Sequence, residues 1–173
     1  MIKYLIGGFL ILSACCLKNE KMITDIYFLS VEGNYQKIGV VEIQNTLDGL
    51  LFQVDLKGLP TGEHGFHIHE NDSCAMTYND VGKVILAGAA GSHYDPQKTN
   101  RHLGPNGAGH KGDLPFLKAD EAGRVKTSFY NYQLSFDEIK NKSLVIHKSG
   151  DNYSDMPKPL GGGGDRIACG VIR

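Results

Sequence analysis

The residues with the clearest chemical potential are the seven histidines, which fall in four places along the chain. They are His64, His67 and His69; His93; His102 and His110; and His147. His67 and His69 stand two apart in an apolar run, so on a β-strand both rings would lie on one face while Phe66 and Ile68 lie on the other. Such a pair can hold a metal ion, although a single pair also arises by chance.

A glycine-rich stretch, residues 88–115, adds a second group of candidate ligands. His93, His102, His110 and Asp113 are spaced 9, 8 and 3 residues apart on a segment that can wrap around an ion. Three imidazoles and one carboxylate form a closed tetrahedral site typical of zinc. A solvated polar loop would not need so many histidines, so the spacing favours metal binding.

His147 ends an apolar run, residues 144–146. Burial of its ring there would be costly without a partner. Taken alone, this position fits a metal ligand and a histidine held by a backbone carbonyl equally well.

Short runs with strand character surround these residues. They cover residues 26–31, 38–43, 51–56, 65–69, 124–132 and 144–147. Asp48-Gly49 marks a hairpin turn before the third run. No long helical periodicity appears, so the sequence predicts one all-β domain, a sandwich or barrel. Residues 88–115 and 151–165 fit no strand, and loops of this length are usually functional.

Two negative inferences narrow the function. The chain has 18 basic and 19 acidic residues without a long run of either sign, which argues against nucleic acid as the main partner. The four glycines at 161–164 are not followed by the Lys-Ser/Thr pair and helix of a phosphate-binding loop. They are therefore interpreted as a turn.

The start of the chain predicts export. A short basic beginning and an apolar run over residues 4–12, too short to span a bilayer, indicate a signal peptide over residues 1–14. Leu12-Ser13-Ala14-Cys15 resembles a bacterial lipobox, which predicts lipidation of Cys15 and a membrane anchor. The alternative is an ordinary cut near Ala14 and a soluble periplasmic protein. Residues 15–24 would form a tether and residues 25–173 the folded domain.

Two further cysteines lie in the body of the chain, Cys74 and Cys169. An exported protein meets an oxidising compartment, so a disulfide is expected. Two buried thiols are the alternative.

Six motifs together resemble one family, the copper–zinc superoxide dismutases of the bacterial periplasmic type. They are Gly65–Glu70, Gly91–Pro96, His102–Pro105, His110–Leu114, Leu144–His147 and Gly164–Ile172. They occur in order, and the likeness extends from about residue 26 to the end of the chain. It implies an eight-stranded Greek-key barrel, an immunoglobulin-like sandwich, with one copper and one zinc held outside it by two long loops.

The resemblance also implies a role for each site residue. The copper ligands would be His67, His69, His93 and His147. The zinc ligands would be His93, His102, His110 and Asp113. The family's remaining features fall on Asp151, which would bridge a copper and a zinc histidine, on Arg166, which would guide the anion, and on the disulfide Cys74–Cys169. His93 would bridge the two ions and move a proton, and His64 would be structural.

The activity implied is disproportionation of superoxide to O₂ and hydrogen peroxide, an antioxidant defence outside the cytoplasm. A metal reservoir or metal chaperone would need the ligands but not Arg166. A structural domain with a decayed site would lack ligands, and copper-only relatives generally lack the zinc loop. In this sequence a residue able to bind metal stands at every ligand position. Whether the protein is a monomer or a homodimer is left open.

Overall fold

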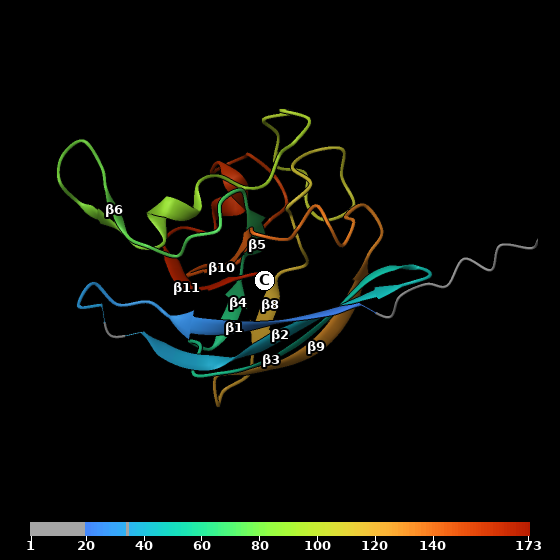
Figure 1. Cartoon of the computed structure of the whole chain (residues 1–173). Helices are drawn as coiled ribbons and strands as arrows, with labels where there is room; N and C mark the ends of the chain where they lie inside the picture. Colours follow the sequence, from blue (N-terminus) through green and yellow to red (C-terminus); the bar gives the residue numbers. More distant parts are fainter. Residues whose placement is uncertain (1–19, 34) are drawn as a thin grey trace, which may run out of the picture.

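The computed structural model describes residues 20–33 and 35–173, which form β-strands and two short 3₁₀ helices (Figure 1). The elements are β1 Lys21–Phe28, β2 Gln36–Thr46, β3 Gly49–Lys57, β4 Gly62–His64, β5 Phe66–His69, β6 Thr77–Tyr78, β7 Val84–Ile85, η1 Gly88–Ala90, β8 Leu117–Ala119, β9 Arg124–Asn131, β10 Ser143–His147, η2 Leu160–Gly162 and β11 Arg166–Val171.

The described strands pair antiparallel throughout. A seven-stranded sheet has the order β5-β10-β11-β1-β2-β3-β9, and β4–β8 and β6–β7 form two-stranded ladders. Only Gly65 separates β4 from β5. Counted as one interrupted strand, these two join β1, β2, β3, β8, β9, β10 and β11 to make the eight strands of a barrel. The sheet curls around its core in Figure 1, so the predicted all-β barrel is confirmed.

Alternation along the strands fills the core. In β3, Leu50, Phe52, Val54 and Leu56 are buried, and the residues between them are not. Burying such a side chain stabilises the fold by about 1.5–3 kcal/mol. Phe52 stacks on Phe129 of β9 with ring centroids 5.1 Å apart. Phe66 of β5 meets the same ring edge-on at 6.5 Å, so the core anchors the strand that carries His67 and His69.

The first strand begins earlier than predicted. β1 starts at Lys21, paired with Gln44 of β2, so residues 21–24 belong to the sheet and not to a tether over residues 15–24. Met22, Thr24 and Ile26 face inward, but Ile23 between them is 56% exposed. That outward isoleucine hides the alternation in the sequence. β11 was likewise not predicted as a strand.

The hairpin predicted at Asp48-Gly49 is present between β2 and β3, where the Thr46 hydroxyl donates to the Gly49 carbonyl. The predicted signal peptide and Cys15 lie outside the described residues. Among the residues described, no helix has the length and hydropathy to cross a membrane.

Candidate metal centre

Pairing between β5 and β10 positions the first group of histidines. Val145 stands opposite His67 and Ser143 opposite His69. All four residues of β5 are buried, because Phe66 and Ile68 enter the core while the two histidines enter the site on the other face. His147 extends β10 beside them, its backbone N–H donating to the Gly65 carbonyl over 2.8 Å.

The long loop is fastened to the edge of β5 by backbone hydrogen bonds. Tyr94 N–H donates to the Ile68 carbonyl, and Ile68 N–H donates to the Gly112 carbonyl, each over 2.8 Å. Isolated bridges pair His69 with His93 and His67 with Asp113. The loop therefore brings its own histidines against those of the strand.

Two groups of buried residues each bring their ligand atoms within 4.8 Å of one another. The first is His67, His69, His93 and His147, and the second is His67, His93, His102 and Asp113. His67 and His93 belong to both. The predicted copper set is brought together complete.

The predicted zinc set is brought together in part. His110 is 8% exposed and lies at the edge of the second group, with its Nδ1 3.6 Å from Asp113 Oδ1. His93 Nδ1 lies 3.1 Å from the same oxygen, and His102 Nδ1 lies 3.0 Å from Asp113 Oδ2. Asp113 is thus at the centre of the three loop histidines.

Each ring of the copper set has one nitrogen held by an acceptor. For His93 this is Nδ1, 3.1 Å from Asp113 Oδ1, and for the other three rings the acceptor lies outside the two groups. His67 Nε2 donates to Asp151 Oδ2 over 2.7 Å, His69 Nδ1 to the Gly91 carbonyl over 2.9 Å, and His147 Nδ1 to the Gly164 carbonyl over 3.0 Å. Carbonyl and carboxylate oxygens only accept, so these nitrogens carry the hydrogens. In the neutral ring the other nitrogen is then a free lone pair, the form that binds a metal.

Those other nitrogens are buried without a hydrogen-bond partner in the described structure. They are His67 Nδ1, His69 Nε2 and His147 Nε2. On the loop, His102 Nδ1 and His110 Nδ1 also lack a well-formed hydrogen bond, although each lies near an oxygen of Asp113. Leaving a buried polar atom unpaired costs about 1–3 kcal/mol. Five such atoms on neighbouring rings fit a site built for metal ions.

Asp151 joins the two groups. Its Oδ2 accepts from His67, and its Oδ1 accepts from His102 Nε2 over 2.8 Å. The Tyr153 backbone N–H also donates to Oδ1, over 2.8 Å. A Cβ at Gly161 would collide with this carboxylate and with the His102 ring, so only glycine fits there.

Asp155 holds the backbone of His102 in place. Its Oδ2 accepts from the His102 N–H over 2.9 Å, while its Oδ1 accepts from the Leu160 N–H over 3.2 Å. Sequence reasoning missed Asp155 and the carbonyls of Gly91 and Gly164. The carbonyls have no side-chain signature, and Asp155 is one of several loop acids.

The electrostatics of the rings differ between the two groups. Burial lowers the pKa of His67 and of His69 well below the usual value, and lowers the pKa of His147 to about 4. Burial alone would also lower the pKa of His102, but Asp113 and Asp151 raise it to about 9. In the metal-free protein, that proton supplies positive charge where the two carboxylates are arranged to receive a cation.

Arg166 lies beside the first group. Its Nη1 donates to the Ala87 carbonyl and its Nη2 to the Gly91 carbonyl, each over 2.6 Å. The Gly91 carbonyl is also the acceptor for His69, so the guanidinium and this ring share one anchor. Its positive charge lowers the pKa of both His69 and His147, after the larger effect of burial.

The expected disulfide is present between Cys74 and Cys169, with Cα atoms 5.8 Å apart and a sequence separation of 95. In the chain-entropy model, closing a loop of this length stabilises the fold by about 4–5 kcal/mol. Cys169 packs with Leu29, Ala87 and Ala90. The bridge therefore holds the segment whose carbonyls position Arg166.

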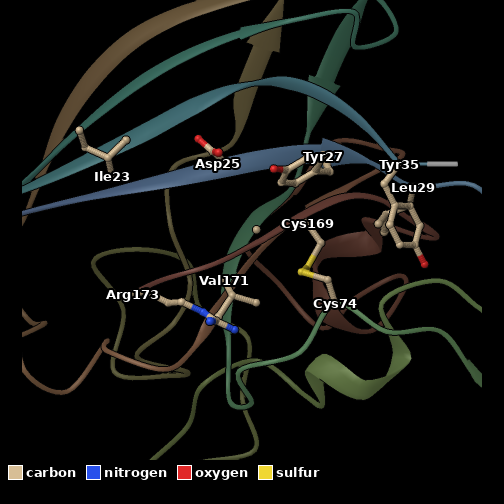
Figure 2. Close-up of a pocket in the computed structure, with 10 residues that line it drawn as sticks. Ile23, Asp25, Tyr27, Leu29, Tyr35, Cys74, Cys169, Val171 and Arg173 are labelled. Carbon is tan, nitrogen blue, oxygen red and sulfur yellow. A yellow bond between two sulfur atoms is a disulfide. The ribbon is translucent and has the colours of Figure 1, made fainter. Parts of the chain in front are cut away.

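The disulfide also borders a surface groove of about 440 Å³ (Figure 2). The groove is lined by outward residues of β1, among them Ile23 and Tyr27, and by the end of β11 with Arg173. None of the seven histidines lines it, so the metal chemistry is not located there.

His64 stays outside both groups. It is 1% exposed, with Nδ1 2.8 Å from the His147 carbonyl and Nε2 2.8 Å from the Pro60 carbonyl. It ties the end of β10 to the segment before β4.

Comparison with known proteins identifies the family. Residues 37–172 match the family model described as copper/zinc superoxide dismutase (SODC). The chain belongs to this family. A superoxide dismutase [Cu-Zn] of Escherichia coli K12 is 51% identical over 150 residues, 86% of each chain. The copper/zinc enzyme of Brucella abortus has a solved structure that superposes with a TM-score of 0.85 at 48% identity, covering 89% of this chain and 100% of that one.

A second solved relative is the monomeric copper, zinc superoxide dismutase of Salmonella enterica, with a TM-score of 0.78, 49% identity, and coverage of 89% of this chain and 100% of that chain. The chain is therefore a superoxide dismutase, an oxidoreductase with copper and zinc as cofactors that disproportionates superoxide to O₂ and hydrogen peroxide.

The buried rings predict how stability of the metal-free superoxide dismutase depends on pH. His67, His69 and His147 have lowered pKa values, so below about pH 6.5 the unfolded chain binds more protons at these rings than the folded chain does. The free energy of unfolding therefore decreases as the pH is lowered. His102, with its raised pKa, contributes fully in that range and loses its contribution only as pH rises toward about 9.

We therefore expect the thermal midpoint of chelator-treated protein to fall between about pH 7 and pH 5. His147→Gln removes one of the buried rings and should make that fall less steep. A midpoint that stays level or rises across this range would contradict the assignment of these rings as buried and neutral.

Proposed function

We propose that copper is held by His67, His69, His93 and His147, and zinc by His93, His102, His110 and Asp113. The observation that carries this proposal is the set of buried, unpaired ring nitrogens facing one another. Their outer nitrogens are already fixed by Asp151 and by the carbonyls of Gly91 and Gly164. The ligands are thus oriented before an ion binds.

His93 is proposed as the ligand shared by both ions. Its Nδ1 faces Asp113, which supports zinc on that side and leaves Nε2 for copper. Its ring stacks on His67 with centroids 3.9 Å apart and lies 5.4 Å from both His102 and His110. His67 also belongs to both groups, but its Nε2 donates to Asp151, which leaves only Nδ1 for a metal ion.

When bound at these histidines, copper would supply the one-electron chemistry of the reaction, because it can change between two oxidation states. Two protons must reach the second superoxide to give hydrogen peroxide. The His93 ring could hold and deliver one of them at Nε2 while that nitrogen is not bound to copper. Because Nδ1 would be a zinc ligand, the ring would stay attached to the site whether or not Nε2 carries a proton.

Arg166 is proposed to attract and orient the anionic substrate. Two backbone carbonyls fix its guanidinium, and the disulfide region supplies them. A fixed positive charge beside the site raises the local concentration of a small anion. This feature favours an enzyme over a metal reservoir, which would gain nothing from a cation next to its metal ligands.

We also propose that the protein acts outside the cytoplasm, in the periplasm, anchored through lipidated Cys15. The short apolar run before Leu12-Ser13-Ala14-Cys15 and the disulfide Cys74–Cys169 support this location. Export without lipidation, to give a soluble periplasmic enzyme, is the second candidate.

For the bridge, His93→Ala should retain copper on the three remaining histidines but lose the dependence of the copper signal on zinc. Electron paramagnetic resonance of Cu(II) protein, recorded with and without zinc, measures this. The control is Ser92→Ala, because Ser92 is the exposed neighbour of His93. A copper spectrum indifferent to zinc in the unaltered protein would rule out the shared ring.

For the anion, Arg166→Ala should lower kcat/KM several-fold at low salt while copper content stays unchanged. The deficit should shrink as salt screens the charge. Arg124→Ala is the matched control, since it removes the same charge from an exposed position at the start of β9. Equal rates for the two variants at low salt would remove the proposed role of Arg166.

For the anchor, Cys15→Ser should abolish incorporation of labelled fatty acid and release the enzyme from the membrane fraction. Cys16→Ser, which alters the adjacent cysteine, should change neither. If the unaltered protein carries no label and its mature N-terminus follows Ala14, the soluble periplasmic alternative holds.

A further inference from the structure

One end of the barrel gathers exposed apolar side chains around the start of β1. Glu20 is bound there, its carbonyl accepting from the Asn45 N–H at the end of β2. The turn that follows β2 carries Leu47, which is 82% exposed. The end of β9 and the residue after it lie beside this turn, because a Cβ at Gly49 would lie 2.6 Å from the Asn131 carbonyl oxygen and 3.3 Å from the Cα of Tyr132.

Two tyrosines extend the patch across β9. Tyr130 is 43% exposed and Tyr132 69% exposed, and their rings stack with centroids 6.0 Å apart. Neighbouring strands are about 4.8 Å apart, so the path β1-β2-β3-β9 spans about 14 Å. We call Leu47, Tyr130 and Tyr132, with the start of β1, the tether end. It lies at the right of Figure 1, where β1 begins beside the β2–β3 turn.

The length of the tether limits which part of the protein can meet a membrane. Lys21, the first strand residue, follows Cys15 by six positions, which reach at most about 20 Å when fully extended. A domain of this size is about 40 Å across. A lipid chain on Cys15 would therefore hold the tether end near the membrane and keep the opposite end away from it.

The chemistry of the patch suits the boundary between lipid headgroups and acyl chains. Tyrosine is enriched at this depth because its ring is apolar and its hydroxyl polar, and an exposed leucine gains by entering the apolar layer. Charge gives no strong preference for anionic lipid, since Lys21 pairs with Glu42 over 2.6 Å and Asp48 adds a carboxylate beside Leu47.

We propose that the tether end rests on the lipid surface to which Cys15 is anchored; this inference depends on the proposed lipidation of Cys15. It has a consequence for substrate access. Arg166 lies at the far end of β1, where the Leu29 N–H donates to the Ile167 carbonyl. Eight strand residues separate the two ends by about 26 Å. The field of a charged membrane, screened within about 8 Å, would not reach the anion entrance.

A tryptophan reporter can test the orientation because the chain contains no tryptophan. Tyr132→Trp places one at the tether end. Tyr78→Trp is the matched control, since Tyr78 is 67% exposed, close to the 69% of Tyr132, and lies on β6, on the far side of Figure 1. Neither residue belongs to the metal centre, so both variants should retain full superoxide dismutase activity.

The mature acylated protein of each variant, beginning at Cys15, is reconstituted in phosphatidylcholine vesicles whose acyl chains carry bromine, a contact quencher. We expect quenching at position 132 to exceed that at position 78 by about fivefold or more, since only the former would reach the acyl region. Leu47→Asp in the Tyr132→Trp background should lower the quenching severalfold while the protein stays bound to the vesicles.

Equal quenching at positions 132 and 78 in vesicle-bound protein would overturn the orientation while leaving lipidation intact. Mass spectrometry of the N-terminal peptide distinguishes the other failure. If Cys15 carries no acyl chain and the protein stays in solution, both the anchor and the docked end are refuted. Addition of phosphatidylglycerol to the vesicles should change the quenching little; a strong dependence on it would replace the apolar contact with an electrostatic one.

Discussion

The bridge made by Asp151 is the interaction on which the metal centre depends most. One buried carboxylate holds His67, from the interrupted barrel strand, and His102, from the long loop. It fixes a hydrogen on the outer nitrogen of each ring and so directs both inner nitrogens toward the centre. Because Gly161 has no side chain, the loop of residues 151–165 can pack against this carboxylate without displacing it.

The buried charges around this bridge explain why the site favours the binding of cations. Asp113 and Asp151 are both buried, and contacts with histidines hold the pKa of each carboxyl well below its usual value, against the opposite effect of burial. Two buried negative charges are costly unless cations accompany them. A proton on His102 meets part of that need in the metal-free protein, and metal ions would meet it more fully when they bind.

Much of this arrangement could be predicted from residue types and spacing, for identifiable reasons. His67 and His69 follow the two-residue period of a strand, and the loop histidines are too dense for a solvated segment. The acceptors behind the rings could not be predicted, since the carbonyls of Gly91 and Gly164 depend on how the loops fold. The start of β1 was missed because Ile23 points outward and interrupts the expected alternation.

Because both faces of β5 are buried, this strand does not tolerate a shift of its register against β10. Phe66 and Ile68 enter the core, and His67 and His69 enter the metal centre, so no residue of the strand is left to solvent. A slip of one position against β10 would put two imidazoles into hydrocarbon and two large apolar groups among the ligands. A misaligned strand would thus be destabilised both in the hydrophobic core and in the metal centre. A chain that pairs these strands correctly has, in the same event, assembled part of its core and three of the four proposed copper ligands, His67, His69 and His147.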